Sequence, residues 1–351
     1  MKHLKTITTK LLLAIAIPFF LISCGDNEPV IKGEFESGVL ILNEGNFGTG
    51  NASVSHFNES NSTVTNNIFQ TITESPLGDV AQSIFVDADK AYVIVNNSNK
   101  VEVVNSNTFK LDFTIDAALP RYMTSFAGKG YLTEWVSFTE SGRVSVIDLS
   151  TGASEATINT GFGAENIIVA NGNIYVSNNF QSDVSVIDPT TNQVTTTIDL
   201  TNAPGGFVID KNGALWVICG GGYDANFSPL NNGAFYKINT ADNSISSTVT
   251  LDTNVAVKIA INNAKDAIYY FIGNEVFKLG IDDSAKPTSA FITESTAVSF
   301  YGIGVNPSND QIFVGDSKGF QANGSVYRYN ADGTAIDNFT VGIGPNGFAF
   351  R

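Results

Sequence analysis

Short apolar segments separated by polar turns run along almost the whole chain, and residues 164–200 show the pattern most clearly. Four runs rich in Val, Ile, Thr and Tyr are separated there by Asn-Gly, by a polar loop at residues 178–183, and by Pro-Thr-Thr-Asn. Runs of this length and composition, bounded by Gly, Asn, Asp and Pro, are typical of strands joined by tight turns. This stretch therefore predicts one four-stranded antiparallel sheet.

The same unit recurs along the chain. The sequence Val-Ser-Val-Ile-Asp occurs at residues 144–148 and again at 184–188, which is 40 residues later. The third-strand position is also found at residues 52–57, 101–104, 234–238, 275–279 and 325–329. The second strand carries an aromatic residue in six copies: Tyr92, Tyr131, Tyr175, Trp216, Tyr269 and Phe313. Seven copies of a four-stranded unit at this period predict an all-β fold, the seven-bladed β-propeller, with these aromatic residues packed between blades.

The two ends of the chain predict how the ring closes. The first copy starts at Gly38 and lacks the first of its four strands. Residues 344–350 match the start of the other copies, and the chain then stops at Arg351. We therefore expect the C-terminal strand to complete the first blade, because closure removes the open sheet edges. The propeller then spans residues 38–351.

Residues 1–23 have the pattern of an export signal. Three lysines precede an apolar run at residues 11–22, which is shorter than a membrane span. The run ends in Leu-Ile-Ser before Cys24, which resembles the lipobox of bacterial lipoproteins and implies cleavage before Cys24 and acylation of that residue. Residues 24–37 then form the lipidated Cys and a tether. The alternative is an ordinary signal peptide with an incidental Cys.

Composition narrows the chemistry. With 19 Lys and Arg against 34 Asp and Glu, the net charge is −15, and no basic run offers a nucleic-acid surface. If Cys24 is acylated, Cys219 has no disulfide partner and is expected to be a small buried hydrophobe. Only His56 remains once the signal is removed, and no metal-spaced set or phosphate loop is present. We therefore expect no cofactor, no metal site and no catalysis.

One face of the propeller is expected to carry the functional residues. In this fold the connections between second and third strands lie on the same face as those leading into the inner strands. Three of the former are unusually long, at residues 136–142, 220–232 and 316–323, and long loops often carry function. The inner strands begin with side chains that differ between copies: Gln82, Arg121, Tyr122, Glu165, Asn166, Lys258, Tyr301 and Asn346. This variation favours ligand binding around the channel; the alternative is that the side chains only fill and solvate it.

Two of these positions invite a specific interpretation. Arg121 is expected either to clamp a carboxylate or phosphate with its planar guanidinium, or to form a salt bridge with Glu165 or Glu44. Trp135 replaces the polar residue that we expect at the equivalent place in other copies, Asn96 and Asn178. An exposed aromatic residue there, with Phe180 on the same face, suits a flat ligand.

Several phrases of the sequence resemble a known family, the YncE-like surface propeller lipoproteins of Bacteroidetes. They are Val-Leu-Ile-Leu-Asn-Glu-Gly-Asn-Phe-Gly at residues 39–48, Asp-Val-Ala-Gln-Ser at 79–83, the strand pair at 92–104, Pro-Arg-Tyr at 120–122 and the terminal segment at 344–350. Ligand-binding roles carried over from the family fall on Asn43, Glu44, Asn46, Phe47, Gln82, Asn96, Arg121, Tyr122 and Asn346.

The resemblance implies a lipid-anchored protein on the outer surface of the outer membrane. It would capture a ligand, cobalamin or a related corrinoid first of all, and pass it to a TonB-dependent transporter. One alternative is a propeller that binds a surface glycan or another protein. The other is a lactonase-like or lyase-like enzyme that uses a calcium ion together with Glu44 and Glu165.

Overall fold

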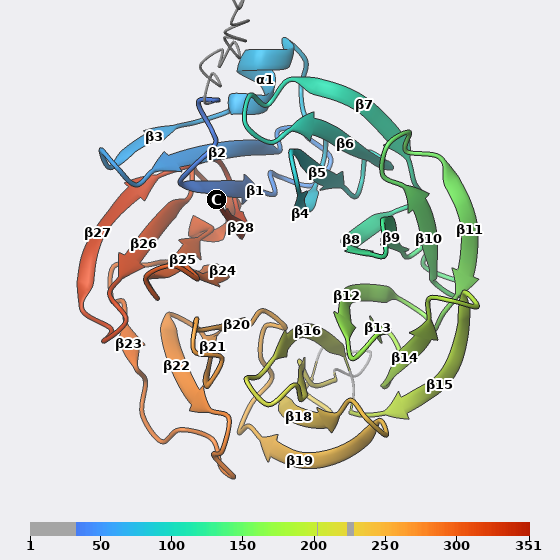
Figure 1. Ribbon diagram of the computed structural model, residues 1–351. Helices are drawn as coiled ribbons and strands as arrows, with labels where there is room; N and C mark the ends of the chain where they lie inside the picture. Colours follow the sequence, from blue (N-terminus) through green and yellow to red (C-terminus); the bar gives the residue numbers. More distant parts are fainter. Residues whose placement is uncertain (1–32, 202, 223–227) are drawn as a thin grey trace, which may run out of the picture. The chain divides into compact units, whose positions relative to one another are not determined.

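The computed structural model describes residues 33–201, 203–222 and 228–351, and residues 33–351 form one compact unit. The export signal and Cys24 lie outside the described residues. Seven four-stranded antiparallel sheets stand around a central channel (Figure 1). The predicted seven-bladed β-propeller is therefore confirmed.

We number the blades in chain order and give the strands from the channel outwards. Blade 1 contains β28 (Pro345–Phe350), β1 (Val39–Asn43), β2 (Ser53–Asn58) and β3 (Thr63–Thr65). Blade 2 contains β4 (Ala81–Asp87), β5 (Lys90–Val95), β6 (Lys100–Asn105) and β7 (Leu111–Asp116). Blade 3 contains β8 (Pro120–Phe126), β9 (Lys129–Glu134), β10 (Arg143–Asp148) and β11 (Ser154–Asn159). Blade 4 contains β12 (Ala164–Ala170), β13 (Asn173–Asn178), β14 (Asp183–Asp188) and β15 (Gln193–Asp199).

The remaining three blades follow the same plan. Blade 5 contains β16 (Pro204–Ile209), β17 (Leu215–Cys219), β18 (Ala234–Asn239) and β19 (Ser244–Thr250). Blade 6 contains β20 (Ala260–Ile261), β21 (Ala267–Ile272), β22 (Glu275–Gly280) and β23 (Ile292–Thr293). Blade 7 contains β24 (Phe300–Val305), β25 (Ile312–Asp316), β26 (Ser325–Tyr329) and β27 (Ala335–Thr340).

Ring closure occurs as the sequence predicts. β28, the last strand of the chain, pairs antiparallel with β1, with Val39 opposite Phe350 and Ile41 opposite Phe348. All five residues of β1 are buried. The first and last strands of the propeller thus lie side by side, so that β1 is covered and blade 1 has four strands like the other blades.

The core lies between the blades. The six second-strand aromatic residues are at most 2% exposed, and they pack in clusters that join neighbouring blades; Tyr175 of blade 4, for example, packs in one cluster with Leu215 of blade 5. Cys219 belongs to the same cluster and is fully buried, and burial raises the pKa of its thiol to about 12. The prediction of a small buried hydrophobe at Cys219 is therefore confirmed.

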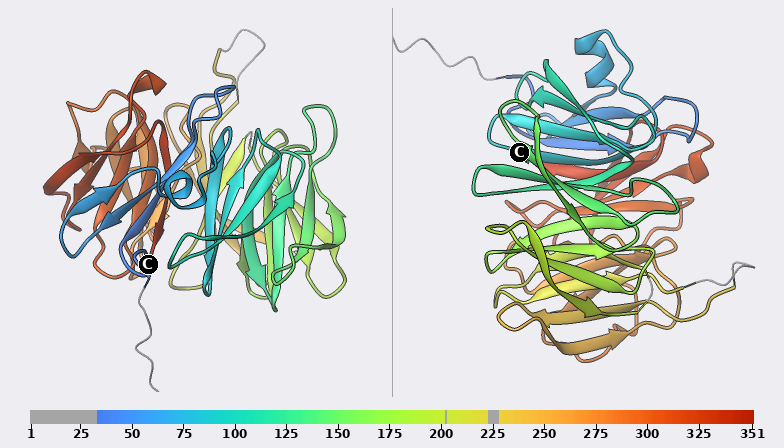
Figure 2. Two further views of the ribbon diagram at one scale, coloured as in Figure 1. Left: turned by 90° about the horizontal axis from the view of Figure 1, so that it is seen from above. Right: turned by 90° about the vertical axis from the view of Figure 1, so that its right-hand side faces the viewer.

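One regular element was not expected from the sequence. The short helix α1 (Ile68–Thr73) follows β3 and lies on the outer side of the ring, as Figures 1 and 2 show. Its first two residues, Ile68 and Phe69, are buried against blade 1. Six residues are too few to give a helical periodicity in the sequence. A one-turn 3-10 helix, η1 (Lys318–Phe320), lies in the connection between β25 and β26.

The two faces of the propeller differ in their connections. We call the mouth face the one that carries the links between second and third strands and the links from each outer strand to the next inner strand. The long connections at residues 136–142 and 316–323, and the described part of 220–232, lie on this face, as predicted. The chain enters β1 from the opposite face, where Phe35 packs against His56 and Phe109.

Blade 6 departs from the plan because its inner strand leans onto blade 5. The N–H of Val255 donates to the carbonyl of Gly220 (3.0 Å), and the N–H of Gly206 donates to the carbonyl of Val257 (3.0 Å). Glycine makes this approach possible, since a Cβ at Gly205 would lie 2.3 Å from the Cβ of Val257. The inner strand of blade 6 keeps only the two residues of β20 paired with β21.

Replacing Gly205 with alanine is therefore expected to reduce the free energy of unfolding by about 1–3 kcal/mol, the usual cost of overpacking. Gly347→Ala is the matched control, because this glycine is also in an inner strand but its Cβ would meet Leu42 at 3.7 Å, an ordinary contact. Urea denaturation of both variants measures the difference. Equal stability of the two variants would contradict the close packing of residues 255–257 on blade 5.

Candidate functional site

A local irregularity places the varied inner-strand residues at the channel. In six blades the pairing between inner and second strand shifts register near the mouth face, for example between Ala81 and Ser83. Such β-bulges turn a side chain away from the regular alternation. The residues at these shifts are Asn346, Gln82, Arg121, Tyr122, Glu165, Asn166, Gly205, Gly206 and Tyr301.

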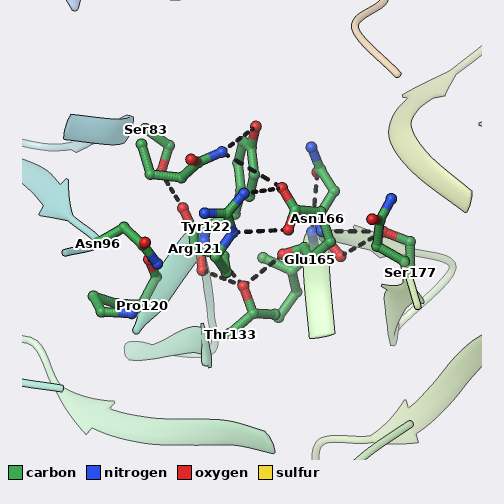
Figure 3. Close-up of polar contacts among 12 residues, drawn as sticks. Ser83, Asn96, Pro120, Arg121, Tyr122, Thr133, Glu165, Asn166 and Ser177 are labelled. Carbon is green, nitrogen blue, oxygen red and sulfur yellow. Dashed lines mark hydrogen bonds and ion pairs between the residues drawn. The ribbon is translucent and has the colours of Figure 1, made fainter. Parts of the chain in front are cut away.

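Arg121 and Glu165 form the most closely held pair at the channel (Figure 3). Arg121 donates through Nε to Glu165 Oε2 (2.7 Å) and through Nη2 to Oε1 (2.8 Å). The two residues are 9% and 6% exposed. Burial lowers the pKa of the Arg121 guanidinium, but the carboxylate of Glu165 outweighs burial and raises this pKa above its ordinary value. Of the interpretations given above, the salt bridge with Glu165 is the one observed.

The backbone around this pair is fixed by two hydroxyl groups. Thr133 Oγ1 lies 2.6 Å from the carbonyl of Glu165 and accepts the N–H of Tyr122 (2.9 Å). Ser83 Oγ donates to the carbonyl of Arg121 (2.6 Å). Figure 3 shows both contacts beside the ion pair. Because these bonds join blades 2, 3 and 4, the ion pair is held in one geometry.

A chain of hydrogen bonds continues from this pair across the channel. Gln82 Nε2 lies 3.4 Å from Glu165 Oε1 and 3.2 Å from Tyr122 Oη. Lys258 Nζ donates to Tyr122 Oη (3.1 Å) and to the carbonyl of Asn346 (3.3 Å). Burial lowers the pKa of Lys258, but Tyr122 and the carboxylates of Glu44 and Glu165 raise it above its ordinary value overall. Lys258 therefore carries a positive charge at neutral pH.

Glu44 is the second carboxylate of the cluster. Tyr301 Oη donates to Glu44 Oε2 (2.6 Å), and Asn346 Nδ2 donates to the same oxygen (3.2 Å). Burial, followed by the charge of Glu44, raises the pKa of the Tyr301 phenol far above its ordinary value, so that it stays protonated. Asn346 is 3% exposed and also donates to the carbonyl of Ala81 (3.0 Å).

These side chains surround a cavity of about 390 Å³ at the mouth of the channel. Its lining residues are Glu44, Val80, Gln82, Arg121, Tyr122, Trp135, Glu165, Asn179, Ala256, Val257, Lys258, Phe271, Phe300 and Tyr301. Its two cations and two carboxylates balance to a net charge near zero, and Val80, Val257, Phe271 and Phe300 add apolar surface to the lining. Asn166 and Asn346 instead line a smaller space of about 190 Å³ in the channel.

Other predicted residues lie outside the cavity. Asn43 and Asn178 are fully buried at the ends of second strands, where Nδ2 donates to Ser55 Oγ and Ser185 Oγ respectively (2.9 Å each). Asn96 Nδ2 donates to the carbonyl of Pro120 (3.1 Å) and so links blades 2 and 3.

Two further predicted residues lie in the connection between β1 and β2. Asn46 Nδ2 donates to the carbonyl of Phe320 (2.9 Å), which ties this connection to the one between β25 and β26. Phe47 is 79% exposed and does not line the cavity.

The aromatic residues form a row that leads away from the cavity. The guanidinium of Arg121 lies 3.8 Å from the centre of the Trp135 ring. Trp135 contacts Phe180 (ring centres 4.7 Å apart) and Phe138 (5.8 Å). Trp135 is thus half-buried and orients Arg121, whereas the exposed rings are those of Phe138 (67%) and Phe180 (42%).

Asn179 is a cavity residue that the sequence did not reveal. Strand pairing sets Glu134 opposite Pro120, Val95 opposite Ala81 and Asn178 opposite Ala164. Trp135, Asn96 and Asn179 therefore follow these positions and are equivalent; the expected equivalence of Trp135 with Asn178 is wrong by one residue. The bond of Asn179 Nδ2 to the carbonyl of Pro204 (3.2 Å) repeats that of Asn96. A correct register would have identified it.

Among the described residues, no group of three or more His, Cys, Asp or Glu side chains is arranged to hold a metal ion. No helix of the described chain is long and apolar enough to cross a membrane.

The fold and the cavity define a seven-bladed β-propeller with a charge-balanced cavity at the mouth of its channel. The family model for "Domain of unknown function (DUF5074)" matches residues 37–346, and the chain belongs to this family. No curated protein matches the sequence. The narrower resemblance to YncE-like surface propellers stays a prediction.

Two solved structures are similar in fold. One is a quinonprotein alcohol dehydrogenase-like protein from Bacteroides thetaiotaomicron, with a TM-score of 0.68 and 15% identity over 90% of this chain and 78% of that one. The other is hydrazine synthase from Kuenenia stuttgartiensis, with a TM-score of 0.57 and 14% identity over 74% of this chain and 86% of that one. At these identities the likeness concerns the fold alone.

Proposed function

We propose that this protein is a non-catalytic binding protein that captures a small organic ligand at the mouth of its channel. The observation that carries the proposal is convergence: side chains from six of the seven blades meet around one cavity of about 390 Å³. This volume lies within the usual range of ligand pockets, about 300–1,000 Å³. The strongest polar groups are held in place by neighbours, which reduces the entropy lost on binding.

The hydrogen-bonding capacity left over in the cavity favours a neutral polar ligand. Arg121 uses Nε and Nη2 on Glu165, and its Nη1 has no hydrogen bond within the described residues. Lys258 Nζ makes two hydrogen bonds and has one N–H left to donate to a ligand. Glu44 accepts through Oε2, so that its Oε1 is left to accept from a ligand. A ligand must therefore supply acceptors for two cations and a donor for one carboxylate. Carboxamide groups do both, whereas a strongly anionic ligand would meet both carboxylates.

We propose cobalamin or a related corrinoid as the first ligand to test. A corrinoid carries primary carboxamides around a flat ring, in agreement with the donors and acceptors of the cavity. It is larger than the cavity and would lie across the mouth with amide side chains inside. The family resemblance noted in the sequence supports the same choice.

Surface anchoring and transfer belong to this proposal and rest on the sequence. Acylation of Cys24 would hold the protein at the outer surface of the outer membrane, and a TonB-dependent transporter would receive the ligand. The first described residues lead into β1 on the face opposite the cavity, and the mouth face is therefore the one proposed to meet the ligand and the transporter.

Calorimetric titration of the purified protein with cyanocobalamin and cobinamide tests the proposal. Lys258→Gln is expected to weaken binding about tenfold or more, because a hydrogen bond from a charged donor contributes about 1.5–3 kcal/mol. The matched control is Lys286→Gln, whose lysine pairs with Asp252 away from the cavity. A folded protein that binds neither compound would contradict the corrinoid assignment, and equal binding by the two variants would contradict the mouth as the site.

A second candidate is binding of a surface glycan or another protein, and one observation favours it. Phe47, Phe138 and Phe180 expose 79%, 67% and 42% of their surface, and all three lie in connections of the mouth face. Exposed aromatic residues commonly mark interaction surfaces. Pull-down from outer membranes with wild type and with the triple serine variant tests it; capture of the same proteins or polymers by both would exclude an aromatic docking surface.

A further inference from the structure

The displaced inner strand of blade 6 leaves a gap beside β21, next to the proposed ligand site. If the register of β20 continued, Lys258 would lie opposite Phe271, since Ala260 pairs with Tyr269. Instead the chain pairs with blade 5 through Val255 and Val257. The half of β21 nearer the mouth face therefore has no inner strand beside it. In the other six blades the inner strand stays beside the second strand.

A cavity of about 410 Å³ occupies this gap. It is lined by Asn254, Val255, Ala256, Phe271, Ile272, Gly273, Ser299 and Phe300. Ala256, Phe271 and Phe300 also line the mouth cavity. The two cavities therefore share part of their lining and lie next to each other, and we call the one beside β21 the groove.

The backbone of Phe271 faces this groove with its polar groups unpaired. In an antiparallel strand the N–H and C=O of alternate residues point to the same side. The carbonyl of Ala267 accepts from Asn262 on the inner side, so Phe271, four residues on, points the same way. Its partner Val276 directs its carbonyl outwards to Phe291. No hydrogen bond to the N–H or C=O of Phe271 is found within the described chain, although the residue is 3% exposed.

Such groups are rarely left unpaired in a folded protein. The unpaired N–H and C=O of Phe271 are spaced as they are along the edge of a sheet. A secondary amide can bond to both groups, because its C=O accepts and its N–H donates. The walls beside them, Val255, Ile272 and Phe300, are apolar and suit a flat extended chain.

We propose that the binding site extends into this groove and takes an elongated ligand whose arm carries a peptide-like secondary amide, bonded to the N–H and C=O of Phe271. The inference rests on the proposed function for the part of the ligand that lies at the mouth. It adds a second recognition point, specific for the amide of the arm.

The amide subsite is tested by titrating the purified, isotope-labelled protein with N-methylacetamide and following the backbone amide signals by NMR. We expect the Phe271 signal to shift saturably, at concentrations that leave the amide of Asp332, in an exposed turn, unshifted. Ala256 lines both cavities, so Ala256→Phe is expected to fill the groove and abolish the shift, and Ala256→Ser to keep it. Ala256 is exposed, so the larger side chain does not disturb the core; Ser299→Phe blocks the groove from the other wall.

A Phe271 shift no larger than that of Asp332, or one that survives both phenylalanine variants, would overturn the inference. Failure of the proposed function is a separate result. Glu44→Gln removes a charge at the mouth and is expected to weaken the corrinoid without changing the N-methylacetamide shift. If no corrinoid binds, the shift of Phe271 still decides whether the groove recognises an amide.

Discussion

Replacing Glu165 with glutamine is expected to lower the free energy of unfolding by about 3 kcal/mol, because removing one partner of a buried ion pair leaves the other charge uncompensated. Arg121 would lose its bidentate carboxylate while remaining 9% exposed. The Trp135 ring below the guanidinium cannot replace a full negative charge. Urea denaturation followed by tryptophan fluorescence measures the change.

The control for this experiment is Glu155→Gln. Glu155 pairs with Lys129 at 2.8 Å, but the two side chains are 39% and 46% exposed. An exposed pair of this kind contributes about 0–1 kcal/mol. If Glu165→Gln is no more destabilising than Glu155→Gln, then the pair does not support the channel wall, and the picture of a rigid mouth is wrong.

The architecture of this protein could be predicted because the sequence repeats one four-stranded unit seven times. A repeated pattern of strand and turn leaves little choice of fold, and the unmatched segments at the two ends required β28 to complete blade 1. The channel residues could also be predicted. Positions at which the seven copies carry different residues are not fixed by the packing that all copies share. Glu44, Gln82, Arg121, Tyr122, Trp135, Glu165, Lys258 and Tyr301 all line the predicted mouth.

Two features could not be predicted from the sequence, because one depends on strand register and the other on the absence of side chains at two glycines. Asn178 points into its blade while Asn179 reaches the cavity, and one residue of register decides between them. The lean of blade 6 depends on the absence of side chains at Gly205 and Gly206, which lie in a different blade. An alignment of repeats treats each copy alone and does not show contacts between copies, which is why the groove at Phe271 was not foreseen.

Removing residues 345–351 is expected to abolish the cooperative unfolding of the propeller. The truncation deletes β28, and with it the inner neighbour of β1, a strand whose five residues are all buried. Phe348 and Phe350, which contact Phe313 with ring centres 5.9 and 5.3 Å apart, are lost as well. Full burial of a large apolar side chain contributes about 1.5–3 kcal/mol, and these two rings, which are partly buried, contribute less than that each. Added to the loss of the strand that covers β1, this is a large fraction of the whole stability of a typical domain, about 5–15 kcal/mol.

Calorimetry and near-ultraviolet circular dichroism of the truncated chain measure the effect. Deleting Arg351 alone is the control; it removes only the bonds of this residue to Gly38 and Asn107 and leaves β28 intact. A synthetic peptide of residues 344–351, added in excess, is expected to restore a single transition, because a segment that binds only the folded state stabilises it by mass action. A truncated chain that melts as sharply as the control would show that the ring holds without its closing strand, and that β1 tolerates an open edge beside the channel.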